Sequence, residues 1–258
     1  MHIPDGYLSP VTYGSLYAVM IPLWYRASKV LKKKLKAREV PYLAMASAFT
    51  FVIMMFNIPL PGGTTGHAVG AALVAIILGP WSALMAVSVA LIIQALLFGD
   101  GGITAIGANC FNMAFIMSFS GYYIYKLLST GAGLLSWRRI AAAAIAGYVS
   151  LNLAALFTAV ELGIQPLIAH KPDGTPLYAP YPLNIAIPAM AIGHLLLLGF
   201  IEAIVTAFVF VYIAKTDPSL LGFKETLPTP PQGKAPGPDP VSSSSSLLKR
   251  GEGDDASS

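Results

Sequence analysis

The chain has 258 residues, of which 55% are hydrophobic and only 11% are charged. A soluble domain carries roughly 25% charged residues, so the composition excludes an ordinary soluble protein and indicates a polytopic membrane protein. The net charge of +4 comes from local clusters and Cys110 is the single cysteine, so we expect no nucleic-acid partner and no internal disulfide. The N-terminus has no basic region and no small-residue cleavage site, which predicts no removable signal peptide.

Apolar segments predict an all-α fold with seven transmembrane helices. In chain order they are 11–30, 41–60, 66–78, 81–98, 103–128, 140–162 and a last segment that follows "YPLNIAIP" and ends near residue 214. The third is short, because 13 residues of helix cover about 20 Å of a hydrocarbon layer of about 30 Å. We therefore expect the loop before it to dip into the membrane inside the protein, as backbone does where it lines a cavity.

Two domains follow from the composition. Residues 1–226 are predicted to form the membrane domain, which binds a metal (see below). Residues 227–258 are rich in Pro, Gly and Ser without apolar periodicity, and they predict a disordered cytoplasmic tail.

Basic residues predict the orientation of the helices. The loop after the first helix carries seven Lys and Arg side chains between Arg26 and Arg38, and three further basic sites fall on the same side of a seven-helix topology: Lys126, Arg138 with Arg139, and Lys215. The opposite side carries only Lys171. By the positive-inside rule the N-terminus lies outside, inserted toward the helices, and the C-terminus is cytoplasmic.

The first two residues can chelate a metal ion. The Met1 amine and the His2 amide nitrogen close a five-membered ring, and the amide nitrogen with His2 Nδ1 closes a six-membered ring. Three coplanar nitrogens favour square-planar Ni²⁺, Cu²⁺ or low-spin Co²⁺ over tetrahedral Zn²⁺. The alternative is that a histidine at a chain start is solvent-exposed and idle.

A fourth nitrogen is predicted from His67, in "PGGTTGHAVGAALVA". The predicted topology places this loop on the same outer side as Met1, above the short third helix. The alternative is a histidine that bonds a carbonyl group at a helix end. The joint position of His2 and His67 favours the metal site.

Other polar residues lie in or beside predicted helices. Asp100, Asn109 and Asn112 lie in "LFGDGGITAIGANCFNMAF", and the two asparagines, three apart, would share a helix face. They could bind the backbone of the inserted N-terminus, or join two helices. Glu202 is an ionisable residue within a span, so it could anchor helix packing or lie near the ion.

The segments "MHIPDGYLSP", "GGTTGHAVG" and "GDGGITAIGANCFNMAF" resemble the substrate-binding component of energy-coupling factor (ECF) transporters for cobalt and nickel, the CbiM/NikM family. The resemblance covers about residues 1–215. It implies seven spans, an inserted N-terminus, and an ion held by Met1, His2 and His67. It also implies a transmembrane coupling subunit, two cytoplasmic ATPases and often a small accessory membrane protein, which is expected here as a separate chain.

The predicted function is capture of Ni²⁺ or Co²⁺ at the outer face of a prokaryotic cytoplasmic membrane, without a cofactor. The chain has no ATP-binding, nucleophile or redox motif, so we expect a transport component and not an enzyme. Two alternatives remain: an intramembrane hydrolase pairing Ser150 or Ser120 with His194, and a passive divalent-metal channel.

Overall fold

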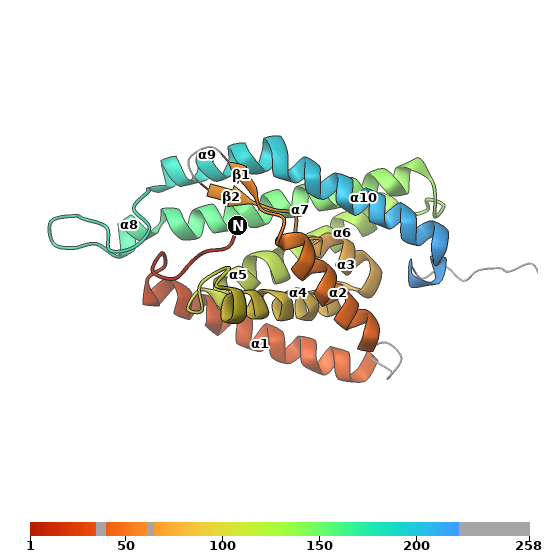
Figure 1. Ribbon diagram of the computed structural model, residues 1–258, viewed down its shortest axis with the longest axis horizontal. Helices are drawn as coiled ribbons and strands as arrows, with labels where there is room; N and C mark the ends of the chain where they lie inside the picture. The colour runs from red at the N-terminus through yellow and green to blue at the C-terminus, as the bar shows by residue number, and fades with distance from the viewer. Residues whose placement is uncertain (35–39, 61–63, 222–258) are drawn as a thin grey trace, which may run out of the picture. The chain divides into compact units, whose positions relative to one another are not determined.

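A computed structural model describes residues 1–34, 40–60 and 64–221 (Figure 1). The first half contains α1 (Pro10–Lys34), α2 (Val40–Met54), β1 (Ile58–Leu60), β2 (Thr64–Gly66), α3 (Ala71–Leu78), α4 (Pro80–Ile93), the π-helical turn η2 (Gln94–Phe98) and α5 (Ile106–Asn109). The second half contains the π-helical η3 (Cys110–Ile116), α6 (Met117–Ser129), α7 (Trp137–Gly163), α8 (Gln165–Ile168), α9 (Leu183–Gly193), the π-helical η4 (His194–Leu198), α10 (Gly199–Thr216) and the 3₁₀ turn η5 (Pro218–Leu221). The predicted tail from residue 227 lies outside the described residues.

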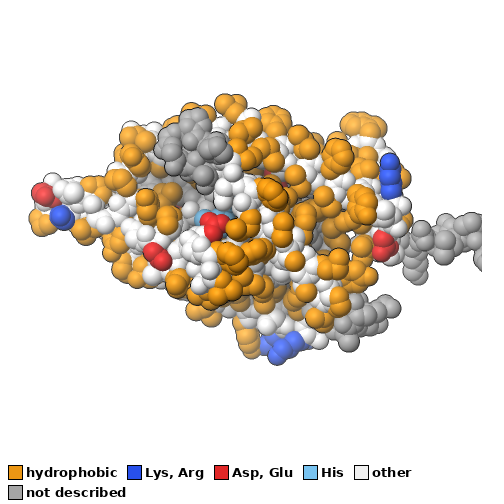
Figure 2. Space-filling view, in the orientation of Figure 1, with side chains coloured by type: hydrophobic (Ala, Val, Ile, Leu, Met, Phe, Trp, Pro, Cys, Tyr) orange, Lys and Arg blue, Asp and Glu red, His pale blue; other side chains and the backbone are white. Residues whose placement is uncertain are grey.

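The fold is mostly helical, as the composition predicts, and each of the seven predicted segments contains helix. Among the described residues, three helices are long and apolar enough to cross a membrane: Pro80–Phe98, Trp137–Ile168 and Leu183–Thr216. Figure 2 shows hydrophobic side chains over most of one face, with the few Lys and Arg side chains near its edges. An apolar outer surface of this kind suits contact with lipid.

A short β-hairpin replaces the ends of two predicted helices. Strands β1 and β2 pair antiparallel, with Ile58 opposite Gly66. The second helix therefore ends at Met54 and the third begins at Ala71. The sequence Ile58–Pro59 accounts for the first difference, because a residue that precedes proline disfavours helical backbone.

The N-terminal segment, residues 1–9, lies among the helices and not outside them. Met1 and Ile3 are buried, with exposed fractions of 7% and 1%. Figure 1 shows the N-terminus in the middle of the helices, not at their periphery. Met1 packs in the main core cluster with Leu198 among others, while Ile3 packs with Ala105 and Ala108. Apolar burial thus contributes to holding this segment in place.

Three π-helical turns interrupt the long helices. They begin at Gln94, Cys110 and His194. Such turns are rare and are frequent at functional sites. Gln94, His194 and the residue before Cys110, Asn109, all have buried polar side chains.

Candidate metal centre

The two histidines predicted to act together lie in direct contact. His67 Nε2 is 3.1 Å from His2 Nδ1, and the ring centroids are 4.7 Å apart. His67 has an exposed fraction of 1%, and the side chain of His2 one of 7%. Adjacent donors of a square-planar ion with metal–nitrogen bonds of about 2.0 Å lie about 2.8 Å apart, close to the observed spacing.

His67 has its proton on the far side of the ring. Its Nδ1 lies 3.0 Å from the carbonyl oxygen of Ala68, an atom that can only accept a hydrogen bond. Nδ1 therefore donates, and in the neutral ring Nε2 keeps its lone pair, directed at His2. A backbone carbonyl that fixes the tautomer in this way is typical of metal-binding histidines.

The amine of Met1 and both imidazoles are held as neutral donors. Burial lowers the pKa of the Met1 amine to about 6, against an opposing effect of Asp100. Burial and the nearby amine lower the pKa of His2 to about 3, and the pKa of His67 also lies well below its usual range for the same reasons. Neutral nitrogens at pH 7 have lone pairs available for a cation.

Asp100 brings a carboxylate to the same place. Its Oδ1 is 3.2 Å from His2 Nδ1, and the side chain is 27% exposed. Partial burial raises the pKa of Asp100, and the Met1 amine opposes this effect. In the described part of the chain no three His, Cys, Asp or Glu side chains gather in the manner of a conventional metal site. The candidate centre instead combines side chains with main-chain nitrogens.

Asn109 holds the backbone of the N-terminal segment. Its Oδ1 accepts the Ile3 N–H at 2.8 Å and its Nδ2 donates to the Ile3 carbonyl at 3.1 Å. The Ile3 carbonyl also accepts the Gly102 N–H at 2.9 Å. A Cβ atom on Gly102 would lie 2.4 Å from the Asp5 nitrogen, so only glycine allows this approach.

Asp5 adds a second attachment of the segment. Its carboxylate accepts the backbone N–H groups of Ile103 and Thr104 at 3.0 and 2.9 Å. The hydrogen bonds with Thr104 lower the pKa of Asp5. The segment before α1 is further held by Gln165, whose Oε1 accepts the Ser9 N–H at 2.9 Å.

Asn112 takes the other of its two predicted roles. Its Nδ2 donates to Thr158 Oγ1 at 3.1 Å and to Glu161 Oε2 at 2.8 Å, both on α7. It therefore joins η3 to α7 and makes no hydrogen bond to the N-terminal segment among the described residues. The two asparagines, predicted as a pair, have separate functions.

Glu202 supports the loop of His67 from α10. Its carboxylate accepts the N–H of Val69 at 2.7 Å and that of Gly70 at 2.9 Å. Glu202 is fully buried. These bonds fix the backbone two residues after His67, so Glu202 orients this histidine and does not itself reach the candidate centre through any bond in the described residues.

The serines of the hydrolase alternative bond to their own helices. Ser150 donates to Gly147 O and Ser120 donates to Ile116 O, while His194 Nδ1 donates to Met190 O. The described residues contain no hydrogen bond between either serine and His194. This arrangement lacks the nucleophile–base contact that such an enzyme needs.

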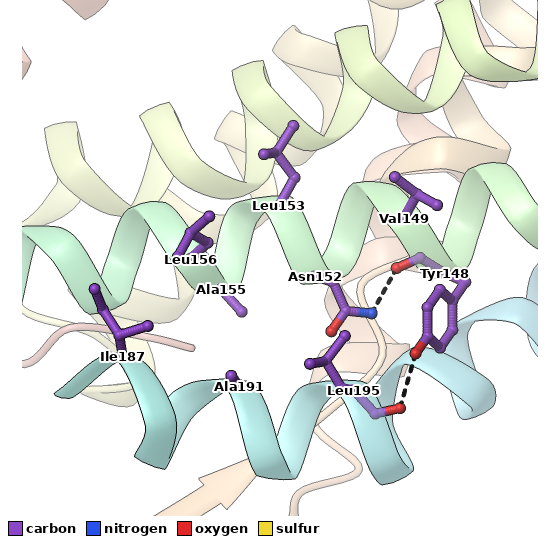
Figure 3. A pocket seen from close by; sticks show the side chains of 9 residues that line it. All are labelled: Tyr148, Val149, Asn152, Leu153, Ala155, Leu156, Ile187, Ala191 and Leu195. Carbon is purple, nitrogen blue, oxygen red and sulfur yellow. Dashed lines mark hydrogen bonds between the residues drawn. The ribbon is translucent and has the colours of Figure 1, made fainter. Parts of the chain in front are cut away.

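The largest apolar groove with a defined lining is remote from this chemistry in composition. It has a volume of about 360 Å³ and lies between α7 and the α9–η4 helix, lined by Tyr148, Val149, Asn152, Leu153, Ala155, Leu156, Ile187, Ala191 and Leu195 (Figure 3). Figure 3 shows Asn152 bonded to the Tyr148 carbonyl and the Tyr148 hydroxyl bonded to the Leu195 carbonyl. A metal ion held by nitrogens needs no cavity of this size, so we assign the ion to the His2–His67 contact.

Comparison with known proteins identifies the family. The family model described as "Cobalt uptake substrate-specific transmembrane region", CbiM, matches residues 2–220. The chain belongs to the CbiM family. It is 52% identical over 221 residues to the fused nickel transport protein NikMN of Rhodobacter capsulatus, covering 86% of this chain and 64% of that protein. The chain thus spans somewhat less than two thirds of this fused relative.

Two further CbiM-like proteins match over most of their length. A putative metal transport protein of Methanocaldococcus jannaschii is 48% identical over 226 residues, covering 87% of this chain and 96% of that one. The crystal structure of a truncated transition metal transporter has 54% identity and a TM-score of 0.79, covering 83% of this chain and 99% of that one. The CbiM fold therefore accounts for the described residues.

Gln94 and Gln165 are functional candidates that the sequence analysis missed. Both amides are fully buried, and Gln94 lies beside His2. A polar residue within an apolar helix is a functional candidate by default, the rule that selects Glu202. The same rule applied to "ALIIQALLFG" selects Gln94.

Proposed function

We propose that this chain is the substrate-binding membrane component of an importer for Ni²⁺ or Co²⁺, with Ni²⁺ favoured. The nickel transport protein that it resembles, and the transition metal transporter whose fold it shares, support this assignment. The observation that carries it is the contact of 3.1 Å between His2 Nδ1 and His67 Nε2 beside a buried, neutral Met1 amine.

The ion is bound in a plane of four nitrogens. The Met1 amine, the His2 amide and His2 Nδ1 supply three of them through the two chelate rings, and His67 Nε2 supplies the fourth. In this set His67 is adjacent to His2 Nδ1, and the adjacent spacing of about 2.8 Å requires the two rings to approach by only a few tenths of an ångström. Square-planar nitrogen coordination selects Ni²⁺, Cu²⁺ or low-spin Co²⁺ over Zn²⁺.

Charge balance gives Asp100 a function in this site. The deprotonated His2 amide contributes one negative charge, and the Asp100 carboxylate, 3.2 Å from His2 Nδ1, contributes a second. Together they neutralise a divalent cation in a poorly hydrated site. Without the ion, Asp100 interacts with the Met1 amine and His2.

The proposed topology has seven spans, with the N-terminus outside and the C-terminus inside. The ends of α1, α6 and α10, near the basic residues, lie at one end of the helices in Figure 1. The loop with α8 lies at the other end, so the distribution of charge along the helices supports this orientation. Residues 1–226 then form the membrane domain, and 227–258 a cytoplasmic tail.

Transport by this chain requires partners. The sequence has no ATP-binding motif, so we propose a transmembrane coupling subunit and a pair of cytoplasmic ATPases, as in ECF importers. A small accessory membrane protein is a further proposed partner. The passive-channel alternative differs in that it predicts metal flux without ATPase subunits.

Calorimetric titration of the detergent-purified chain tests the proposal. We expect tight binding of Ni²⁺ or Co²⁺, weak binding of Zn²⁺, and loss of binding in His2→Ala and in His67→Ala. His170→Ala is the matched control, because His170 is exposed in a loop and bonds only Lys171 O. Unchanged affinity in either His2→Ala or His67→Ala would refute the four-nitrogen site.

A further inference from the structure

His2 and Gln94 each have a buried polar atom without a partner. In the described part of the chain, His2 Nε2 and Gln94 Oε1 both lack a hydrogen bond of normal geometry. Gln94 is fully buried among apolar helices. An unpaired buried polar atom is destabilising, so two such atoms on neighbouring side chains point to a contact between them.

The orientation of the Gln94 amide leaves its oxygen for His2. The Nε2 group reaches Phe51 O at 3.5 Å and Met55 Sδ at 3.9 Å, both on the side of α2. Burial lowers the pKa of His2, and a hydrogen bond from the Gln94 side chain raises it in opposition. The contact is therefore longer or less aligned than an ideal hydrogen bond, but close enough to act on the imidazole.

The backbone of Gln94 is connected to the same centre. Its carbonyl oxygen accepts the Asp100 N–H at 3.1 Å, and Asp100 Oδ1 lies 3.2 Å from His2 Nδ1. The turn η2, which begins at Gln94, thus carries one group toward each nitrogen of the His2 ring.

These two groups favour opposite tautomers of His2. A proton on Nδ1 would be stabilised by the Asp100 carboxylate, and it would remove the lone pair that a metal needs. A proton on Nε2 would be stabilised by the Gln94 carbonyl and leaves Nδ1 free. His67 has the corresponding support from the Ala68 carbonyl.

We propose that Gln94 is a positioning residue for the metal centre: its side-chain carbonyl accepts the His2 Nε2–H and so keeps the Nδ1 lone pair directed at the ion. The inference rests on the proposed function, because it assigns Nδ1 as the ligand atom. Groups that orient a ligand histidine in this way typically change metal affinity 10–100-fold when they are removed.

The test compares three variants of the full chain in detergent. Gln94→Met keeps the length of the side chain and removes the acceptor, Gln94→Glu keeps an acceptor oxygen, and Asn152→Leu removes a part-buried amide of the groove in Figure 3. Nitrogen-15 NMR of the metal-free protein reports the tautomer of His2, assigned from its absence in His2→Ala. Calorimetry with Ni²⁺ reports affinity.

We expect the wild type, Gln94→Glu and Asn152→Leu to hold His2 with its proton on Nε2. Gln94→Met should move the proton to Nδ1 and weaken Ni²⁺ binding about 10–100-fold. An unchanged tautomer in Gln94→Met, or an equal loss of affinity in Asn152→Leu, overturns the proposal. If Gln94→Met does not fold, loss of the Nε2–H tautomer in Gln94→Glu overturns it and retention supports it.

The two proposals fail in different ways. If the wild type binds neither Ni²⁺ nor Co²⁺, the proposed function is wrong, while the tautomer in the metal-free protein still decides the contact of Gln94. If the wild type binds Ni²⁺ and Gln94→Met binds it equally well, only the function of Gln94 is wrong.

Discussion

Replacing Asn109 tests whether the bonds to the N-terminal backbone support metal binding. Asn109→Leu removes both hydrogen bonds to Ile3. The Ile3 carbonyl keeps the Gly102 N–H at 2.9 Å, so only the Ile3 N–H loses its partner in a site where Ile3 is 1% exposed. An unpaired buried donor costs about 1–3 kcal/mol. Because tenfold in affinity corresponds to about 1.4 kcal/mol, Ni²⁺ binding should weaken about 5- to 150-fold.

Calorimetry with Ni²⁺, together with thermal unfolding of the metal-free protein, measures this effect. The matched control is Asn112→Leu, because Asn112 is equally buried three residues along the chain but bonds only α7. Asn112→Leu should lower the unfolding temperature and leave the affinity within about twofold. Asn109→Asp keeps the acceptor for the Ile3 N–H, so it should retain most of the affinity. Equal losses of affinity in Asn109→Leu and Asn112→Leu would show that general destabilisation, and not the hold on Ile3, is responsible.

Three further predictions concern charge and the loop of His67. Since binding releases the amide proton, Ni²⁺ affinity should rise about tenfold per pH unit above pH 6 and about a hundredfold per unit below it, where the Met1 amine, whose pKa is lowered to about 6, also loses a proton; a titration series without a break near pH 6 would contradict this. Asp100→Asn should weaken Ni²⁺ binding and move that break to lower pH, because Asp100 raises the pKa of the amine. Glu202→Gln should lower both the unfolding temperature and the affinity, the latter about 10–100-fold, because an amide offers one acceptor oxygen where Val69 and Gly70 need two; thermal shift and calorimetry check this, and unchanged affinity would exclude an orienting function.

The sequence predicted those features that depend on local composition or covalent spacing. Apolar runs located the helical segments, and the charge pattern and loops suggested that His2 and His67 lie on one side. The structure brings their rings together, while their function as ligands stays a prediction. The β-hairpin was not predicted, because three-residue strands carry too few residues for a period of two to be visible.

The different functions of Asn109 and Asn112 could not be predicted either. Residues three apart share a face only on an α-helix. The π-helical turn η3 begins at Cys110, between the two asparagines, and its wider turn advances each residue by a smaller angle. Asn109 therefore faces Ile3 while Asn112 faces α7. Gln94 was missed for a different reason, since its partner is the chain start, about ninety positions away along the sequence.

The π-helical turns also determine where the length of this chain can change. Each π turn holds one residue more than an α-helical turn, so deletion of a single residue within 95–98 would leave a regular, equally apolar helix. Everything after it would rotate by about 100° relative to Gln94, which would carry Asp100 away from His2. Such a deletion changes no hydrophobic pattern and no ligand residue. Insertions and deletions that separate functional members of this family should therefore be found in the connecting loops and not within η2, η3 or η4.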